Sequence, residues 1–416
     1  MTYELFSKKQ IASMLWWFKK DTENKKAIIC DGSVRSGKTI SMTIGFVLWS
    51  MKTFNGENFA FCGKTIDSLK RNVITPMQKW LMGIVDMKIN FSKNYLEIAL
   101  DGRKNRYYMF GGKDESSYQL IQGITLAGIL CDEAALMTRS FVEQAVTRCS
   151  VKGSRLWFNC NPESSEHWFY KEWILKADEK NALHLHFTMD DNLSLAEETK
   201  IMYEKSFTGV FYDRYIRGLW VLAEGLVYEN WKDDYVLDEY VPTAEAEYFI
   251  SCDYGTVNPC SMGLWALEYD KSVRIAEYYH NGRTDRRRTD EEHYSELEKL
   301  AGNRYISCVI VDPSAASFIE CIRKHGRFKV RPAKNSVISG IRAAATLIDM
   351  KKIFVCRNCK DIIREFSLYR WNEKSSEDAV IKENDHAMDD MRYFVNNILA
   401  PKMLRDIYRN GGENNV

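Results

Sequence analysis

Short apolar runs alternate with helical patterns along the first half of the chain. Each run is a few residues long and is bounded by polar residues or glycine, which predicts a buried strand rather than a helix. The expected strands cover residues 27–30, 58–62, 106–110, 128–131 and 154–158. Helical periodicity is clearest at 67–82, with a break or kink expected at Pro76, and at 140–148. This alternation is typical of an open α/β sheet.

A different pattern begins near residue 248, after a polar, helical stretch at 188–219 and irregular chain at 220–240. Three consecutive strand patterns are joined by short turns, which predicts an antiparallel meander. The meander strands are expected at 248–253, 261–269 and 273–279. The elements expected after them are a helix at 290–300, a strand at 306–311, a helix at 340–349, a short strand at 353–356 and a helix at 386–399.

Length and composition indicate a protein with two or three globular domains. The chain has 416 residues, of which 45% are hydrophobic and 28% charged, and no apolar run approaches the length of a membrane span. Eleven cysteines without a regular spacing, and no signal peptide in the first ten residues, predict free thiols in a reducing cytoplasm. We expect four segments: 1–187, 188–244 as a small lid or linker, 245–400, and a C-terminal tail at 401–416.

The formal net charge of +1 does not by itself indicate a nucleic-acid-binding protein. Basic residues are nevertheless grouped locally. Arg283–Arg288 contains four arginines in an expected loop, and Lys64, Lys70 and Arg71 form a smaller group. Each group is either a solvated surface or a contact for a polyanion, and charge alone leaves both interpretations open.

A phosphate-binding loop follows the first expected strand. Residues 32–39 read Gly-Ser-Val-Arg-Ser-Gly-Lys-Thr, and the apolar stretch 40–50 predicts the helix that such a loop must precede. The two glycines let the backbone N–H groups turn inward, the lysine reaches the β- and γ-phosphates, and the hydroxyl binds Mg²⁺. The expected nucleotide-binding residues of the loop are Gly32, Ser33, Arg35, Ser36, Gly37, Lys38 and Thr39.

Two acidic residues end the expected strand at 128–131. Asp132 is expected to hold the Mg²⁺ shell with Thr39, and Glu133 to polarise the attacking water. A second carboxylate beside the metal carboxylate distinguishes hydrolysing motors from most kinases and switch GTPases. Loop and acid pair together predict an ATPase that uses ATP and Mg²⁺.

Three arginines are candidates to stabilise charge on the γ-phosphate. Arg35 lies inside the loop and could act in cis, or it could pair with Asp132 or Glu133 in the empty state. Arg139 and Arg148 are candidates for a finger donated to a neighbouring subunit.

Amide side chains and one aromatic residue complete the expected nucleotide site. Asn159 and Asn161 follow the strand at 154–158 and could sense hydrolysis by exchanging hydrogen-bond partners, although the sequence does not decide which asparagine does so. Phe6 and Gln10 precede the loop at a spacing that suits adenine recognition, with stacking by Phe6 and hydrogen bonding by Gln10.

A second group of acids follows strands of the second half. Asp253 ends the first meander strand, and Asp312 ends the strand at 306–311. Asp389 lies on the last expected helix, three residues after His386 and on the same helix face. Three carboxylates from these positions are what a ribonuclease H-like fold uses to hold two Mg²⁺ or Mn²⁺ ions for attack on a phosphodiester. Asp385 and Asp390 compete with Asp389 for this role.

The motifs form an ordered set along nearly the whole chain. They are Phe6-Ser7-Lys8-Lys9-Gln10, the arginine-bearing phosphate loop, Cys131-Asp132-Glu133-Ala134, Asn159-Cys160-Asn161-Pro162, Gly218-Leu219-Trp220, Asp253-Tyr254-Gly255, Val311-Asp312-Pro313-Ser314 and His386-Ala387-Met388-Asp389. This set resembles the large terminase subunit of tailed phages and prophages, of the PBSX type. The resemblance implies an N-terminal P-loop ATPase sheet of the ASCE type, a small lid or linker and a C-terminal ribonuclease H-like nuclease domain.

The resemblance also implies a function and partners. A motor of this family docks as a ring, expected to be a pentamer, on the portal protein of an empty procapsid, pumps double-stranded DNA and cuts the concatemer, while a small terminase subunit selects the DNA. By motif, Lys38, Thr39, Asp132 and Glu133 carry ATPase roles, and Asp253, Asp312 and Asp389 carry metal roles with His386 accessory. The expected location is the host bacterial cytoplasm and, transiently, the portal, but not the mature virion or a membrane.

Two other functions fit the same residues. A helicase-nuclease of DNA repair or defence would use both sites but would separate the strands of its substrate. An ATP-gated DNA-binding scaffold would keep the second acid cluster for structure alone.

Overall fold

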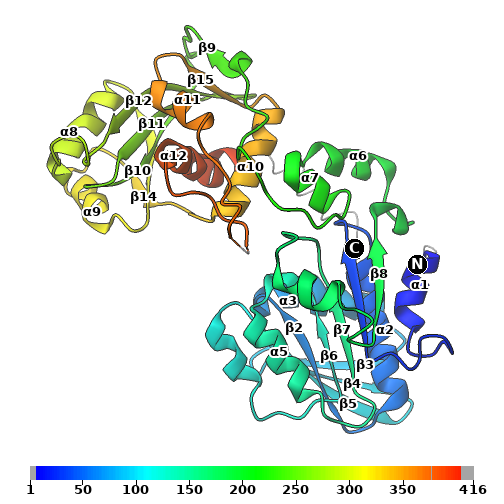
Figure 1. The fold of residues 1–416 in the computed structure, drawn as a ribbon. Coiled ribbons are helices and arrows are strands. Elements are labelled where there is room, and N and C mark those ends of the chain that lie inside the picture. The colour runs from blue at the N-terminus through cyan, green and yellow to red at the C-terminus, as the bar shows by residue number, and fades with distance from the viewer. Residues whose placement is uncertain (1–5, 376, 404–416) are drawn as a thin grey trace. The chain divides into compact units, whose positions relative to one another are not determined.

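The protein is described from a computed structural model that covers residues 6–375 and 377–403 (Figure 1). Two compact units divide the chain, and each is described by itself. The first contains the residues up to Glu204 together with Val210–Leu222, and the second contains Lys205–Gly209 and the residues from Ala223 onward. Most of the predicted tail at 401–416 lies outside the described residues. No helix in the described part is both long enough and apolar enough to cross a membrane.

The first unit is built on an eight-stranded sheet with the order β3-β4-β5-β2-β6-β7-β1-β8. The β3–β4 and β4–β5 pairs are antiparallel, and the other pairs are parallel. The strands are β1 (Ala27–Gly32), β2 (Asn58–Gly63), β3 (Asp86–Asn90), β4 (Tyr95–Leu100), β5 (Arg103–Gly111), β6 (Gly128–Cys131), β7 (Arg155–Asn159) and β8 (Ala182–Phe187). All five strands expected in this half are present, so the predicted α/β class is confirmed.

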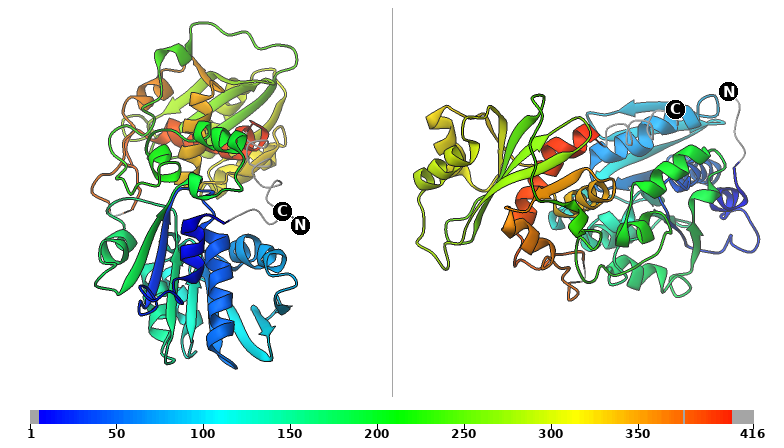
Figure 2. Two further views of the ribbon diagram at one scale, coloured as in Figure 1. Left: turned by 90° about the vertical axis from the view of Figure 1, so that its right-hand side faces the viewer. Right: turned by 90° about the horizontal axis from the view of Figure 1, so that it is seen from above.

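Helices cover both faces of this sheet (Figures 1 and 2), and an apolar core lies on each face. Successive residues of a strand point to opposite faces, so Ile28 and Cys30 of β1 join one core while Ala27 and Ile29 join the other. The first core includes residues of α2, and the second includes residues of α5. The helices of this part of the chain are α1 (Lys8–Leu15), α2 (Lys38–Thr53), α3 (Ile66–Leu69), α4 (Thr75–Trp80), α5 (Arg139–Arg148), α6 (Glu197–Lys205) and α7 (Gly209–Tyr215).

The helical pattern at 67–82 is interrupted near Pro76, as expected. A five-residue π-helical segment, Lys70–Ile74, separates α3 from α4, and Pro76 lies in the first turn of α4. Proline has no N–H to donate, and its ring clashes with the carbonyl four residues earlier. The wider turn just before Pro76 accommodates both effects, so the helix changes its geometry and does not stop.

Three strands of the first unit were not predicted. β3 and β4 form an antiparallel hairpin at one edge of the sheet, and no residue of β3 is fully buried. β8 forms the other edge, and its inner residues alternate between half-buried and exposed. Edge strands carry more polar side chains than central strands, which weakens the apolar signal used to find them.

The second unit is built on a seven-stranded sheet with the order β14-β13-β10-β11-β12-β15-β9. Strands β10, β11 and β12 form the predicted antiparallel meander, and β13 pairs in parallel with β10. This arrangement is that of a ribonuclease H-like sheet, as expected. The strands are β9 (Val236–Leu237), β10 (Glu247–Asp253), β11 (Cys260–Leu267), β12 (Ser272–His280), β13 (Ile306–Val311), β14 (Val330–Pro332) and β15 (Ile353–Cys356).

Helices lie on both sides of this second sheet (Figure 1). The core on one side contains residues of α8 and α9, while Phe394 at the end of α12 stacks on Trp265 of β11 with ring centroids 4.5 Å apart. The helices are α8 (Asp290–Ala301), α9 (Ala316–His325), α10 (Val337–Asp349), α11 (Lys360–Phe366), α12 (His386–Phe394) and α13 (Ala400–Met403). The sequence predicted α8, α10 and α12 but not α9 or α11.

Replacing Gly45 by alanine is expected to destabilise the first unit. A Cβ atom at this position of α2 would lie 2.8 Å from both the Cα and the carbonyl oxygen of Met14, so one helix must move away from the other. Overpacking of this kind costs about 1–3 kcal/mol. Urea denaturation followed by circular dichroism measures the change, with Lys52→Ala at the exposed end of α2 as the control. An unchanged unfolding midpoint for Gly45→Ala would contradict the close packing of α1 on α2.

Candidate active sites

The phosphate-binding loop joins the end of β1 to the start of α2. Both of its glycines have positive φ and closely approach other parts of the unit. A Cβ atom on Gly32 (φ +123°) would lie 1.9 Å from the carbonyl oxygen of Phe187, and one on Gly37 (φ +81°) would lie 2.1 Å from Nε2 of Gln10. Glycine is therefore required at position 32 by conformation and by the nearby backbone, and at position 37 by its positive φ.

Lys38 is buried and points into its own loop. Its Nζ donates to the carbonyl oxygens of Ser33 (2.7 Å) and Gly32 (3.1 Å), to Oγ of Ser36 (3.1 Å) and to Oδ1 of Asn161 (3.2 Å). Burial lowers the pKa of Lys38 because the ammonium group loses solvation. The Ser33 hydroxyl is buried and has no hydrogen-bond partner among the described residues. The loop thus gathers a cation and several polar groups in one buried place.

Asp132 connects three elements at the carboxyl edge of the sheet. Its Oδ1 accepts hydrogen bonds from the Thr39 hydroxyl (3.1 Å) and from Nδ2 of Asn159 (2.8 Å). Burial raises the pKa of this carboxyl, and the two hydrogen bonds oppose that effect. The structure therefore brings the predicted Mg²⁺ residues, Thr39 and Asp132, side by side.

Glu133 follows Asp132 in a left-handed backbone conformation, with φ 58°. Its N–H donates to Oδ1 of Asn159 at 3.2 Å, so Asn159 contacts both acidic residues. Burial, together with the neighbouring charge of Asp132, raises the pKa of Glu133 to about 7. A non-glycine residue held at positive φ costs free energy, and such residues cluster at functional sites. A carboxyl with this pKa can accept a proton near neutral pH.

Arg35 also has a positive φ, 57°, and its guanidinium turns toward α6. Nε donates to the Tyr203 hydroxyl at 2.6 Å, and the guanidinium carbon lies 5.3 Å from the centre of the Tyr203 ring. The structure thus pairs Arg35 with Tyr203 rather than with Asp132 or Glu133, which was the alternative for the empty state.

The other two candidate fingers lie on α5. Arg139 forms an exposed ion pair with Glu143 (2.6 Å), whereas Nε of Arg148 is buried without a partner among the described residues. Which arginine contacts phosphate stays a prediction.

The residues proposed for adenine recognition lie next to the loop. Gln10 is buried in α1, accepts a hydrogen bond from the Ser7 N–H through Oε1 (2.9 Å), and places its Nε2 against Gly37. Phe6 is half-buried just before that helix. The two asparagines have separate partners, since Asn159 contacts the acid pair and Asn161 contacts Lys38.

A buried carboxylate under the loop was missed by the sequence reasoning. Asp31, 1% exposed, accepts hydrogen bonds from Nε1 of Trp220 (2.7 Å), from His184 (2.8 Å) and from His186 (3.1 Å). Burial alone would raise the pKa of Asp31, but these hydrogen bonds hold that pKa well below its usual range. The available signal was the His-x-His alternation of β8, which places both imidazoles on one side of the strand.

In the second unit, Asp253 and Asp312 face one tyrosine hydroxyl. Tyr393 Oη lies 3.4 Å from Oδ1 of Asp253 and 3.3 Å from Oδ2 of Asp312. His386 Nδ1 lies 2.8 Å from Oδ2 of Asp253. Burial raises the pKa of Asp253 to about 7; the charges of Asp389 and Asp312 add to this rise, and the hydrogen bond with His386 opposes it. Burial lowers the pKa of His386, but Asp253 outweighs it and the pKa is raised. Concentrated negative charge of this kind favours a bound cation.

Asp389 has cationic partners of its own. Arg392 Nη2 lies 2.9 Å from Oδ1 of Asp389, and Lys382 Nζ lies 3.5 Å from Oδ2. Lys382 also lies 3.4 Å from Oδ2 of Asp385. Among the described residues, Asp253, Asp312 and Asp389 do not all bring ligand atoms within 4.8 Å of one another. The structure thus links Asp253 to His386 by a direct hydrogen bond and to Asp312 through the Tyr393 hydroxyl, and it holds Asp389 next to Arg392.

Asp390 belongs to a different cluster. Its Oδ1 accepts hydrogen bonds from Nη1 of the buried Arg274 (2.6 Å) and from the Ser251 hydroxyl (2.9 Å), and its Oδ2 accepts one from Ser261. Both Arg274 and Asp390 are fully buried. Removing one partner of such a pair leaves an uncompensated charge. This geometry favours a structural role for Asp390.

Comparisons with known proteins relate both units to phage proteins. A family model described as the N-terminal part of the T4likevirus-type large terminase subunit matches residues 29–232. The large terminase of a thermophilic bacteriophage is 50% identical, with a TM-score of 0.89 over 95% of this chain and 100% of that one. The same phage protein in complex with ATP-gamma-S is 49% identical, with a TM-score of 0.85. The large terminase subunit of Escherichia phage T5 is 24% identical over 297 residues, which span 66% of this chain and 66% of that relative.

Replacing Asp31 by asparagine is expected to lower the free energy of unfolding of the first unit by about 1.5–3 kcal/mol, the contribution of hydrogen bonds to a charged group. The pKa of Asp31 is lower in the folded protein than in the unfolded chain, where it is about 3.9. The stabilisation is therefore complete above that unfolded value and decreases as the pH falls toward the folded value.

Urea denaturation at neutral and acidic pH measures this difference between the wild-type protein and Asp31→Asn. Asp178→Asn, which changes an exposed carboxyl of the same unit, is the control and should leave stability unchanged. A difference in the free energy of unfolding between wild type and Asp31→Asn that grows in acid would contradict the lowered pKa of Asp31 in the folded protein.

Proposed function

The chain belongs to the large terminase family of phage DNA-packaging proteins, and we propose that its first unit hydrolyses ATP to move double-stranded DNA and its second unit cuts that DNA. The observation that carries this proposal is the arrangement of Lys38, Thr39, Asp132 and Glu133 at the carboxyl ends of the parallel strands β1 and β6 in one sheet. The complex of the thermophilic-phage relative with ATP-gamma-S supports ATP as the nucleotide that this chain binds.

In the proposed ATPase, Lys38 leaves its loop carbonyls to bind the β- and γ-phosphates. The Thr39 hydroxyl oxygen and Oδ1 of Asp132 lie 3.1 Å apart, and Mg²⁺ prefers oxygen ligands of this kind. The ion would neutralise charge on the phosphates. Glu133 accepts a proton from the attacking water, because its pKa of about 7 is matched to neutral pH. Asn159 contacts both acids, so it is the asparagine placed to sense the change when the phosphate leaves.

The proposed nuclease site contains Asp253, Asp312 and Asp389, with His386 as an accessory residue. The carboxylates are oxygen donors that fit Mg²⁺ or Mn²⁺, and two such ions would stabilise the attacking and leaving oxygens of a phosphodiester. His386 orients Asp253 through their hydrogen bond, and Tyr393 holds Asp253 and Asp312 toward one point. Asp389 would hold the ions in place of its present partners, Lys382 and Arg392.

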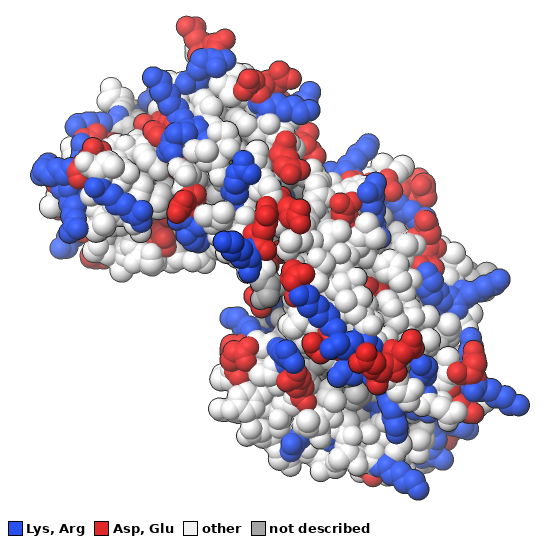
Figure 3. All heavy atoms as spheres, in the orientation of Figure 1, with Lys and Arg blue, Asp and Glu red and all other residues white. Residues whose placement is uncertain are grey.

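The DNA and packaging partners follow from the family. Acidic and basic side chains are interspersed over the face shown in Figure 3, so local groups rather than net charge would contact the duplex. In the loop after β12, Arg286 and Arg288 pair with glutamates, whereas Arg287 is exposed with no partner among the described residues. We propose Arg287 as a phosphate contact.

The proposed assembly is a ring, a pentamer, on the portal protein, with DNA selected by a small terminase subunit, in the host cytoplasm. A helicase-nuclease is the alternative, and it would release single strands from a labelled duplex during ATP hydrolysis. The proposed motor would not.

Substitutions at the first site are expected to stop ATP hydrolysis. Lys38→Ala removes the phosphate contact, and Glu133→Gln removes the base and lowers kcat by about 10²–10⁴-fold. In the wild-type protein, kcat/KM for ATP should fall as the pH drops below about 7, because Glu133 must be deprotonated to act and its pKa lies there. Steady-state phosphate release at several pH values measures both effects.

Arg35→Ala and Arg139→Ala are compared in the same assay. If Arg35 acts in cis, Arg35→Ala should lower kcat by about 10³-fold or more, and Arg139→Ala should not. A wild-type profile that stays flat below pH 7 would argue against Glu133 as the base.

Substitutions at the second site are expected to abolish DNA cleavage and leave ATP hydrolysis intact. Asp253→Asn and Asp312→Asn each remove one carboxylate from the proposed metal site, which is in the other unit from the phosphate loop. Conversion of supercoiled plasmid to nicked and linear forms, with Mg²⁺ or Mn²⁺, measures cleavage. Asp270→Asn, an exposed aspartate after β11, is the control and should cut like wild type. Continued nicking of the plasmid by the Asp253 and Asp312 variants would contradict the proposed nuclease site.

A further inference from the structure

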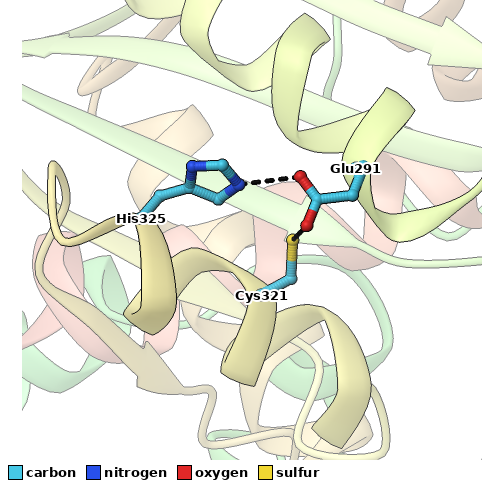
Figure 4. A group of neighbouring side chains, drawn as sticks. All are labelled: Glu291, Cys321 and His325. Atoms are coloured by element: carbon cyan, nitrogen blue, oxygen red, sulfur yellow. Dashed lines mark hydrogen bonds and ion pairs between the residues drawn. The ribbon is translucent and has the colours of Figure 1, made fainter.

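Three donor side chains of different chemistry meet where α8 contacts α9 in the second unit (Figure 4). Nε2 of His325 lies 2.8 Å from Oε2 of Glu291, and Sγ of Cys321 lies 3.6 Å from Oε1 of the same carboxylate. One donor atom from each residue lies within 4.8 Å of the other two. The carboxylate thus stands between a thiol and an imidazole.

Regular helices hold all three donors. Cys321 and His325 are four residues apart on α9 and therefore share one face, and Glu291 lies in the first turn of α8. The His325 ring stacks on the buried Tyr294, with centroids 3.8 Å apart and an interplanar angle of 8°. Phe318, on the same helix as the thiol, packs in the core shared by α8 and α9. Donors on packed helices are better fixed than donors on loops.

We propose that Glu291, Cys321 and His325 form a binding site for a zinc-like transition-metal ion that links α8 to α9. Thiolate, imidazole and carboxylate are the three ligand types that Zn²⁺ uses in proteins. Zinc bonds of about 2.0–2.3 Å in tetrahedral geometry place neighbouring donors roughly 3.3–3.6 Å apart. The present spacing of the donors therefore needs only small side-chain rotations to admit the ion.

The donor set also decides which metals bind. Mg²⁺ prefers oxygen ligands, so it should not compete for a site with one sulfur and one nitrogen donor. The proposed nuclease residues are chiefly carboxylates on β10, β13 and α12, whereas this site is on α8 and α9. Glu291 and His325 are exposed, which leaves the fourth coordination position open to solvent. The proposal does not depend on either proposed activity.

Cobalt titration of the full-length protein tests the site. The protein is treated with a chelator, dialysed, kept reduced with a phosphine, and titrated with Co²⁺ in excess Mg²⁺, which occupies the all-oxygen sites. A thiolate ligand gives Co²⁺ a sulfur-to-metal charge-transfer band in the near ultraviolet. Wild type should show one equivalent of this band, and Zn²⁺ should displace it and raise the melting temperature.

Variants assign the band to these residues. Cys321→Ser should abolish the band, and His325→Ala and Glu291→Gln should each weaken Co²⁺ binding by more than about tenfold, since even outer-shell changes cost 10–100-fold. Cys308→Ser changes a half-buried thiol on β13 and should bind like wild type. If Cys321→Ser misfolds, His325→Ala replaces it as the test. A band of unchanged intensity and unchanged Co²⁺ affinity in His325→Ala would then overturn the proposal. Absence of the band in wild type, or its persistence in Cys321→Ser, would overturn the proposal and leave an ion pair between Glu291 and His325.

Discussion

The hydrogen bonds around the buried carboxylate of Asp132 are the constraint on which the first site depends. Asp132 follows the end of β6, yet its partners come from the start of α2 and the end of β7. Strand order explains how they meet, because β7 lies between β6 and β1 and so places Asn159 between the acid pair and the phosphate loop. Burial opposes charge on Asp132, and Thr39 and Asn159 offset that cost. A change in any one of the three elements would move the other two.

The second unit depends on a comparable constraint, in which two adjacent aspartates have different partners. Successive residues of a helix point about 100° apart, so Asp389 and Asp390 leave α12 in different directions. Asp390 enters the core and is neutralised by Arg274 of β12, together with two serines of β10 and β11. That buried ion pair holds α12 on the meander. It thereby positions His386, one turn before Asp390, and Tyr393, one turn after it, against Asp253.

Apolar patterns predicted the central strands of both sheets because those strands are buried on both faces and read as continuous apolar runs. The patterns missed β3, β4, β8, β9 and β14, which lie at or near sheet edges, and the helices α9 and α11. The motifs predicted Lys38, Thr39, Asp132, Asp253 and Asp312 as site residues, since each lies in the phosphate-binding loop or at the end of a predicted strand. They did not predict Asp31, because its two histidines lie on an unrecognised strand some 150 residues later.

The sequence by itself determined the two-part α/β architecture and the family, because strand runs, loop glycines and their order along the chain are local properties. Only the tertiary structure decided which side chains meet. It separated Asp390 from Asp389, gave Asn159 and Asn161 different partners, turned Arg35 to Tyr203, and placed Cys321 and His325 opposite Glu291. Each of these results depends on packing between elements that are distant in the chain, and a one-dimensional pattern contains no distances between such elements.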